Sequence, residues 1–505
     1  MATETTVTSS RAFRAAWSIC LMVGLTSSIA LARSVTAQDA PASSQPIDLP
    51  VTTSSAAAAA YFEKGMREYE MHRWNLALND WNEAVKLDPH FALAHAWICM
   101  TTVDPAEEAA HRDAAETNVM QVTLGEQLVI EWMAGMHENH YLHGITAMND
   151  VLAMYPHDKR LNFLFGYWLY RQDQYDVAER LTQKALAEDP KYATAWNQLA
   201  YIYSRRGEYP QALTAARRYV DLLPDQPNPH DSYGEMLRLS GRFEEALEQY
   251  HMALKIDPTF YISQKELGET YAIMGQGEKA RQEYAKAVQE APGDGLKAEY
   301  LQKSAMTFVR AGQFDEADKA YLSAAEKAHA MQQWVWEARA YRIMAMYASD
   351  AKAAMKDLDK AEALLAARQG SVAQADLDEE HARIWRVRAE RAATNRDFLT
   401  ADKAIAALQQ MADSAGSTSI ERTYEGAVGT VLATEGKFAD AIPHLEEDFA
   451  NPLSMKVLVD AYEKTKAKDQ ASSLRQRLQA WRIPSVEEAL VVPAMMPQRA
   501  GLSKR

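Results

Sequence analysis

One spacing dominates the middle of the sequence. Five prolines follow one another at intervals of 34 residues: Pro156, Pro190, Pro224, Pro258 and Pro292. Proline ends a helix because it lacks the backbone N–H and crowds the preceding turn. A fixed period of this length indicates small units stacked in one direction, each burying its apolar face on the next. A chain of 505 residues can then fold without one central core.

Small and aromatic residues return at matching places within each interval. Before three of the prolines the sets are Ala212, Ala216 and Tyr219, then Ala246, Tyr250 and Ala253, then Ala280, Tyr284 and Ala287. An alanine suits a close helix crossing, and an aromatic residue four positions on lies on the same helix face. Gly166, Gly234 and Gly268 recur in step with Ala200. Glycine inside a helix costs about 1 kcal/mol relative to alanine, so its return predicts tight helix contact.

Glycines also mark the expected turns between helices, and the whole pattern resembles the tetratricopeptide-repeat family. Gly207, Gly241, Gly275 and Gly312 stand where a helix would close through the left-handed conformation. The resemblance implies an all-α fold, a tetratricopeptide-type α-solenoid in which antiparallel helix pairs form a right-handed superhelix. It is clearest over 159–292 and extends to 58–89 and 298–328. We expect ten or eleven helix pairs in total.

The pattern divides the chain into six segments. They are a signal peptide (1–37), a flexible linker rich in Ala, Ser and Pro (38–57), partly degenerate N-terminal helix pairs (58–157), a regular array (158–328), a degenerate C-terminal helical region (329–482) and a C-terminal tail (483–505). The unit after Pro292 arrives three residues late, which predicts a short insertion at 293–295.

The N-terminus has the composition of an export signal. Arg11 and Arg14 precede an apolar run over 15–32, and Val35 and Ala37 fit a cleavage site. An uncleaved anchor is the alternative, because the run is near the minimum spanning length of roughly 17 residues. Cys20 lies at the wrong end of the run for a lipoprotein. We therefore expect export to the periplasm or envelope of a bacterium, with membrane contact only if the segment stays uncleaved.

Charge and residue counts narrow the function classes. The net charge of −15 disfavours a nucleic-acid partner. Cleavage would leave Cys99 as the single cysteine, which rules out an intrachain disulfide and a cysteine-rich zinc site. No phosphate-binding glycine loop and no Gly-x-Ser-x-Gly nucleophile motif is present. We predict no enzyme activity, no catalytic residues and no cofactor.

A histidine cluster is the most suggestive metal motif. His137, His140 and His143 lie three residues apart, whereas the zinc-protease helix needs two histidines four apart to reach one ion. We interpret the cluster as polar residues at an inter-helix turn and predict no metal site, with a metal site as the alternative.

The resemblance implies that five positions of each first helix face the concave groove. In the units at 159 and 193 these positions contribute Phe163, Tyr167, Tyr170, Arg171, Asn197, Tyr201 and Arg205. Rings, amides and guanidinium groups suit extended peptides, so these residues form our candidate peptide-binding groove. Ordinary solenoid surface is the alternative. The next units carry Asp231, Glu235, Lys265 and Glu269, which do not reproduce the Lys and Asn clamp of chaperone-binding relatives.

These observations lead to a function expected from the resemblance. We expect an exported scaffold that binds a protein or peptide partner, in bacterial envelope assembly. One alternative is an adaptor or accessory subunit of an envelope secretion or polysaccharide-export machine. A third is an enzyme with an unrecognised site.

Overall fold

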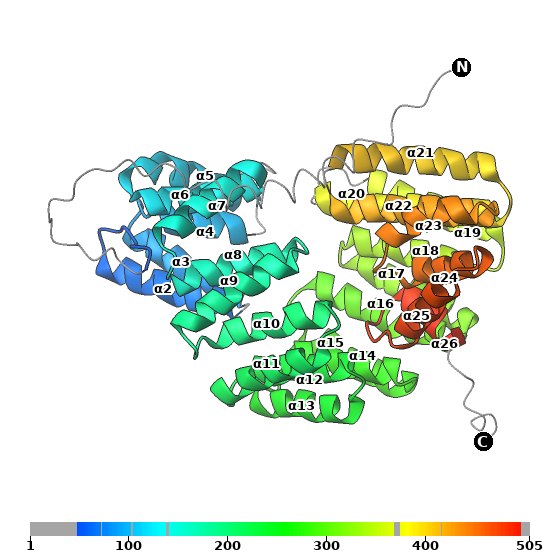
Figure 1. The fold of residues 1–505 in the computed structure, drawn as a ribbon, viewed down its shortest axis with the longest axis horizontal. Helices are drawn as coiled ribbons and strands as arrows, with labels where there is room; N and C mark the ends of the chain where they lie inside the picture. Colours follow the sequence, from blue (N-terminus) through cyan, green and yellow to red (C-terminus); the bar gives the residue numbers. More distant parts are fainter. Residues whose placement is uncertain are drawn as a thin grey trace, which may run out of the picture. The chain divides into compact units, whose positions relative to one another are not determined.

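The computed structural model describes residues 48–71, 73–102, 105–137, 141–367, 374–415 and 417–495. These residues form 25 α-helices, α2 to α26, with one 3-10 turn and no strand (Figure 1). The prediction of an all-α array is confirmed. The predicted signal peptide and the linker up to residue 47 lie outside the described residues. Among the described helices, none combines the length and the apolar character needed to cross a membrane.

The regular array consists of helix pairs of constant length. Each first helix has 13 residues and each second helix 14: α8 (Lys159–Arg171) and α9 (Tyr175–Glu188), α10 (Ala193–Arg205) and α11 (Tyr209–Leu222), α12 (Pro227–Leu239) and α13 (Phe243–Ile256), α14 (Tyr261–Ile273) and α15 (Gly277–Glu290). Each second helix ends shortly before the proline of the 34-residue series, as the sequence predicts.

Further pairs precede and follow this array. Before it lie α2 (Ala56–Glu70) and α3 (Trp74–Leu87), α4 (Ala92–Thr101) and α5 (Pro105–Asn118), the 3-10 turn η2 (Val119–Gln121), then α6 (Leu124–His137) and α7 (Tyr141–Met154). After it lie α16 (Asp294–Arg310) and α17 (Phe314–Ala330), α18 (Trp334–Tyr347) and α19 (Ala351–Ala366), α20 (Gln374–Thr394) and α21 (Phe398–Ala415), α22 (Thr418–Thr434) and α23 (Phe438–Glu447), α24 (Pro452–Lys464) and α25 (Lys468–Gln479). The described residues thus hold twelve consecutive pairs, not ten or eleven, because some later pairs have longer helices and no proline marker.

Recurrent glycines lie where the two helices of a pair touch. A Cβ added to Gly234 would come within 2.7 Å of the Tyr250 ring, and one added to Gly268 within 2.8 Å of the Tyr284 ring. Both tyrosines are completely buried. Because no side chain fits there, the predicted tight contact is confirmed. The turn at Gly241 has φ +84°, the left-handed conformation that the sequence predicts.

The insertion predicted at 293–295 is absorbed by a helix. The helix α16 begins at Asp294 and has 17 residues, whereas the preceding first helix, α14, has 13. The extra length therefore extends the helix and does not form a loop.

Residues 48–55, which we call the strap, are extended and fixed, although the sequence assigns them to a flexible linker. Three buried carboxylates from three successive pairs hold the strap: Leu49 N–H donates to Asp158 (2.7 Å), Thr52 N–H to Glu126 (2.6 Å) and Ser54 N–H to Asp88 (2.7 Å). These charge-assisted hydrogen bonds give the strap an order that its Thr- and Ser-rich composition does not predict.

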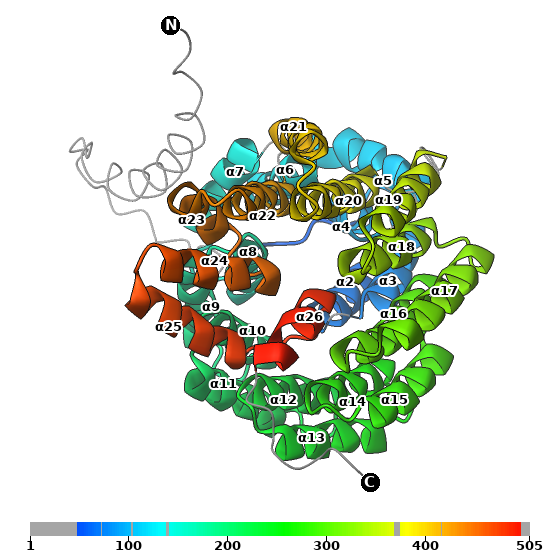
Figure 2. The same ribbon diagram turned by 90° about the vertical axis from the view of Figure 1, so that its right-hand side faces the viewer.

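A further helix, α26 (Val486–Met495), lies in the segment assigned to the C-terminal tail. It packs against α16 and α24 (Figure 2). Val486 and Ala489 join the apolar core of the α16 to α20 region. Short chain segments near the end are hard to assign from periodicity, because ten residues contain too few helical turns to show a pattern.

Candidate functional site

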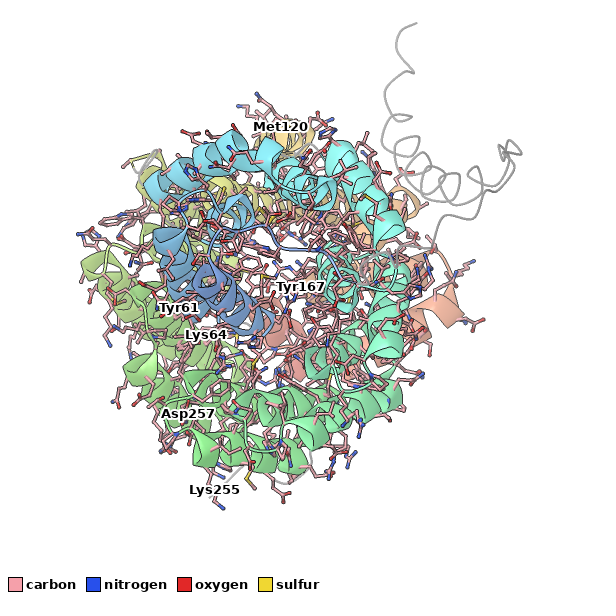
Figure 3. The ribbon with its side chains drawn as sticks, turned by 90° about the vertical axis from the view of Figure 1, so that its left-hand side faces the viewer. Tyr61, Lys64, Met120, Tyr167, Lys255 and Asp257 are labelled. Atoms are coloured by element: carbon pink, nitrogen blue, oxygen red, sulfur yellow. The ribbon has the colours of Figure 1, made fainter. Side chains whose placement is uncertain are left out.

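The first helices of neighbouring pairs contact one another along the inner face of the array. The contacts run from α8 to α10, α12, α14 and α16. On them one position repeats every 34 residues, and we call this series the inner column: Tyr167, Tyr201, Glu235, Glu269 and Lys303. Figure 3 shows Tyr167 on the inner side of the helix pairs, away from the outward-lying Lys255 and Asp257. The column compares equivalent sites in successive units.

The column begins with an aromatic surface on α8. Tyr167 and Tyr170 stack with ring centroids 6.5 Å apart, and both are half-buried. Arg171 is exposed at the end of the helix. Phe163, which the sequence places in the groove, is only 3% exposed and packs against Tyr192 at 5.2 Å. Its ring therefore belongs to the core between units, and the other three side chains form the accessible surface of α8.

The neighbouring helix α10 continues this surface. The exposed Arg205 donates a hydrogen bond from Nε to the Tyr170 hydroxyl at 3.3 Å. Tyr201 is half-buried, and its hydroxyl donates to Glu235 at 2.8 Å. Asn197 is 5% exposed, and its side-chain oxygen accepts no hydrogen bond from a described residue. The structure thus brings Tyr167, Tyr170, Tyr201 and Arg205 together, while Asn197 lies beneath them.

A buried charge network occupies the same column on α12, α14 and α16. Arg238 is 2% exposed, and its Nη2 lies 3.0 Å from Glu266 and 3.5 Å from Glu269. Lys303 adds a bond of 2.8 Å to Glu269. Burial raises the pKa of Glu269, but Lys265, Lys303 and Arg238 outweigh it and hold that pKa below its usual range. Most of the charge in this region is therefore used in internal pairs.

Asp231 lies beside this network with an unusual protonation. Burial, followed by the nearby Glu266 carboxylate, raises the pKa of Asp231 to about 8. The Ser263 hydroxyl donates to it at 2.5 Å, which only partly offsets these effects. Asp231 therefore carries a proton over part of the neutral range.

The C-terminal segment (residues 481–495) covers part of this charged face. Arg238 Nη1 donates to the backbone carbonyl of Arg482 at 2.6 Å. The Arg310 guanidinium of α16 pairs with Glu488 of α26, which is 1% exposed. These contacts join residues 244 and 178 positions apart. A sequence search by local period cannot find them, although two charged residues in an otherwise apolar short helix were the available signal.

The predicted histidine turn lies partly outside the described residues, which omit 138–140 and with them His140. His143 pairs with Glu131 at 2.6 Å. In the part of the chain that the structure covers, no group of three or more metal-ligating side chains gathers. Cys99 is buried and free, and burial raises the pKa of its thiol.

Comparison with known families places the central repeats. Residues 163–227 and 234–295 match a family model described as tetratricopeptide repeat. These two stretches coincide with the array from α8 to α15 and with most of the candidate surface. The resemblance deduced from the proline and glycine spacing is confirmed there.

Individual proteins match shorter or more distant parts. Superkiller complex protein 3 of Mus musculus is 29% identical over 111 residues, 22% of this chain and 7% of that protein. The TPR repeat-containing thioredoxin TTL4 of Arabidopsis thaliana is 32% identical over 80 residues, 16% of this chain and 12% of that protein. This chain thus spans only a small part of these curated relatives. A tetratricopeptide repeat protein from Parabacteroides merdae has 15% identity and a TM-score of 0.37, covering 52% of this chain and 98% of that structure.

Proposed function

We propose that this chain, an array of tetratricopeptide repeats, is an exported scaffold that binds an extended segment of a protein partner in the bacterial envelope. Tyr167, Tyr170, Arg171, Tyr201 and Arg205 form the contact surface, hereafter the ring–arginine surface. The observation that carries the proposal is that Arg205 and Arg171 are exposed beside stacked rings, whereas Arg238 is consumed in the buried network.

The chemistry of the ring–arginine surface fits a peptide. Tyrosine rings bury apolar area at low entropy cost, and guanidinium groups bind peptide carbonyls and carboxylates through several N–H donors. Arg205 already donates from Nε to Tyr170, so its geometry is partly set before binding. The proposal assigns no catalytic step and no cofactor to this surface.

Export and location rest on the N-terminal segment, with Arg11 and Arg14 before an apolar run. Expression of the full chain in a bacterial host, followed by fractionation and N-terminal sequencing, tests this part. We expect the protein in the periplasmic or envelope fraction with a new N-terminus at Gln38. A cytoplasmic protein that retains residue 1 would contradict export.

The binding part is tested with a double variant, Tyr170→Ala with Arg205→Ala, and a matched control, Arg217→Ala. The control removes an exposed arginine on α11, whose side chain is 61% exposed and pairs only with its helix neighbour Asp221. Proteins captured from envelope extract are quantified by mass spectrometry. We expect at least tenfold loss of specific partners with the double variant and none with the control. Equal capture by all three proteins would exclude this surface.

A further inference from the structure

A cavity of about 620 Å³ lies where the strap meets the N-terminal first helices. Side chains of the strap, α2, α4, α6 and α8 line it, and it reaches the start of α10. Its apolar wall includes Phe62, Met66, Leu93, Trp97, Leu161 and Leu164. The volume falls within the range of roughly 300–1,000 Å³ that is typical of ligand pockets.

The charges around this cavity are compensated by one another. Arg160, at 29% side-chain exposure, pairs with Glu70 at 2.7 Å and with Glu63 at 3.0 Å. Lys159 pairs with Asp189 at 2.6 Å. A charged ligand group would have to compete with these pairs, so the interior favours uncharged, apolar groups.

The wall also holds a polar atom that could bind a ligand. Thr194, at the start of α10, is 9% exposed, and its hydroxyl makes no hydrogen bond with any described residue. A buried hydroxyl without a partner destabilises a protein by about 1–3 kcal/mol. A ligand that carries a hydrogen-bonding group, such as a peptide backbone, would satisfy it.

The strap shows which kind of chain this wall accepts. Leu49 and Val51 are two residues apart and both line the cavity, as alternate side chains of an extended chain do. The strap backbone is held by carboxylates of Asp158 and Glu126, outside the apolar wall. An extended polypeptide with apolar residues at every second position is therefore already bound along one edge, and the cavity remains open beside it.

We propose that this cavity receives bulky apolar side chains from an extended polypeptide partner, whose backbone hydrogen-bonds the Thr194 hydroxyl. The inference rests on the proposed function and deepens it, because it gives the ring–arginine surface an anchoring pocket. Leu164 in the pocket and Tyr167 on the surface are three residues apart on α8, so one extended chain can contact both. The pocket selects the partner's apolar residues and the ring–arginine surface binds its polar ones.

The test uses the full chain and two fluorescent peptides of glycine and serine. One carries two leucines at alternate positions, and the other has serine in their place. We expect fluorescence anisotropy to show binding of the leucine peptide, at least tenfold tighter than the serine peptide, since each leucine buries apolar surface. Equal affinity for the two peptides would contradict the proposal.

Two variants locate the binding. Leu164→Trp fills the cavity and should weaken the leucine peptide at least tenfold. Because a larger residue can disturb the core, Thr194→Val provides an isosteric second variant, expected to weaken binding roughly three- to tenfold through loss of one hydrogen bond. Circular dichroism and thermal melting check the fold of both. Wild-type affinity in Thr194→Val and in a folded Leu164→Trp would overturn the proposal.

Two further measurements distinguish a polypeptide from a lipid, and the pocket from the ring–arginine surface. Dodecanoate tests a lipid ligand, and its binding without any binding of the leucine peptide would contradict a polypeptide occupant. The Tyr170→Ala, Arg205→Ala protein should still bind the short leucine probe within about twofold, because neither residue lines the cavity. Loss of envelope partners with normal probe affinity in the cavity variants would retain the proposed function and reject the pocket.

Discussion

The inner faces of α8–α10 and of α12–α16 are built on the same backbone unit and have opposite chemistry. Arg205 and Arg238 both stand in the last turn of a first helix. Arg205 is exposed and contacts Tyr170, whereas Arg238 is 2% exposed, pairs with two glutamates and donates to the Arg482 carbonyl. The repeat therefore fixes where a side chain stands, and the neighbouring residues decide whether it is available to a partner.

The C-terminal segment explains much of this division. It covers the face of α12 and α16 with polar contacts at Arg238 and Arg310, and it makes no such contact with α8 or α10 among the described residues. A partner that approached α12 to α16 would have to displace these buried pairs, whose disruption leaves uncompensated charge. The open face of the inner column is therefore the face at its start.

Replacing the two arginines by methionine should show the largest difference. In Arg238→Met, Glu266 and Glu269 lose a buried cation, so we expect the free energy of unfolding to fall by about 3–5 kcal/mol. In Arg205→Met, an exposed side chain loses one hydrogen bond, and we expect a change within about 1 kcal/mol. Chemical denaturation followed by circular dichroism measures both.

The pair of variants serves as its own control, because both exchanges keep a long flexible side chain. Similar losses in the two proteins would show that the two faces do not differ in the way described. A loss confined to Arg238→Met, together with unchanged partner capture by that protein, would support the division.

The protonation of Asp231 gives a smaller and pH-dependent difference. Burial and Glu266 raise the pKa of Asp231 from 3.8 to about 8 in the folded protein, so the folded state keeps a proton that the unfolded state releases. This stabilisation is complete below pH 3.8 and is lost as the pH rises through about 8. The free energy of unfolding of the wild type should therefore fall with rising pH, relative to Asp231→Asn, by on the order of 1 kcal/mol per pH unit.

Denaturation of both proteins at several pH values within this window measures the difference. The asparagine amide stays neutral, and its oxygen can still accept from Ser263. Parallel pH curves for the two proteins would show that Asp231 titrates normally.

The regular part of the fold could be predicted because it is written locally. Proline spacing, the small residues at Gly234 and Gly268 and the turn glycines each act within one unit, through helix ends and helix contact. The same step of 34 residues also placed Tyr167 and Tyr201 on one face. Local rules repeated many times give a dependable prediction.

The rest depended on contacts between distant segments. The strap is bound by Asp88, Glu126 and Asp158, and the C-terminal segment by Arg238 and Arg310. No periodic pattern connects these residues, since each pairing joins a non-repeating segment to a repeat. Phe163 illustrates the same limit on a smaller scale, because packing against Tyr192 moves it from the expected groove into the core.

Tyr201 stands at the border between the two faces and should give the smallest effect. Its hydroxyl donates to Glu235 at 2.8 Å, while its ring belongs to the ring–arginine surface. Tyr201→Phe keeps the ring and removes the hydrogen bond, so we expect a loss of about 0.5–1.5 kcal/mol in the free energy of unfolding. Burial and Glu266 already raise the pKa of Glu235, and the Tyr201 hydroxyl lowers it, so that pKa should rise further in the variant. Partner capture should stay within about twofold if the ring is what the partner contacts. A large loss of capture without a loss of stability would mean that the hydroxyl itself binds the partner, and the border would then lie beyond α10.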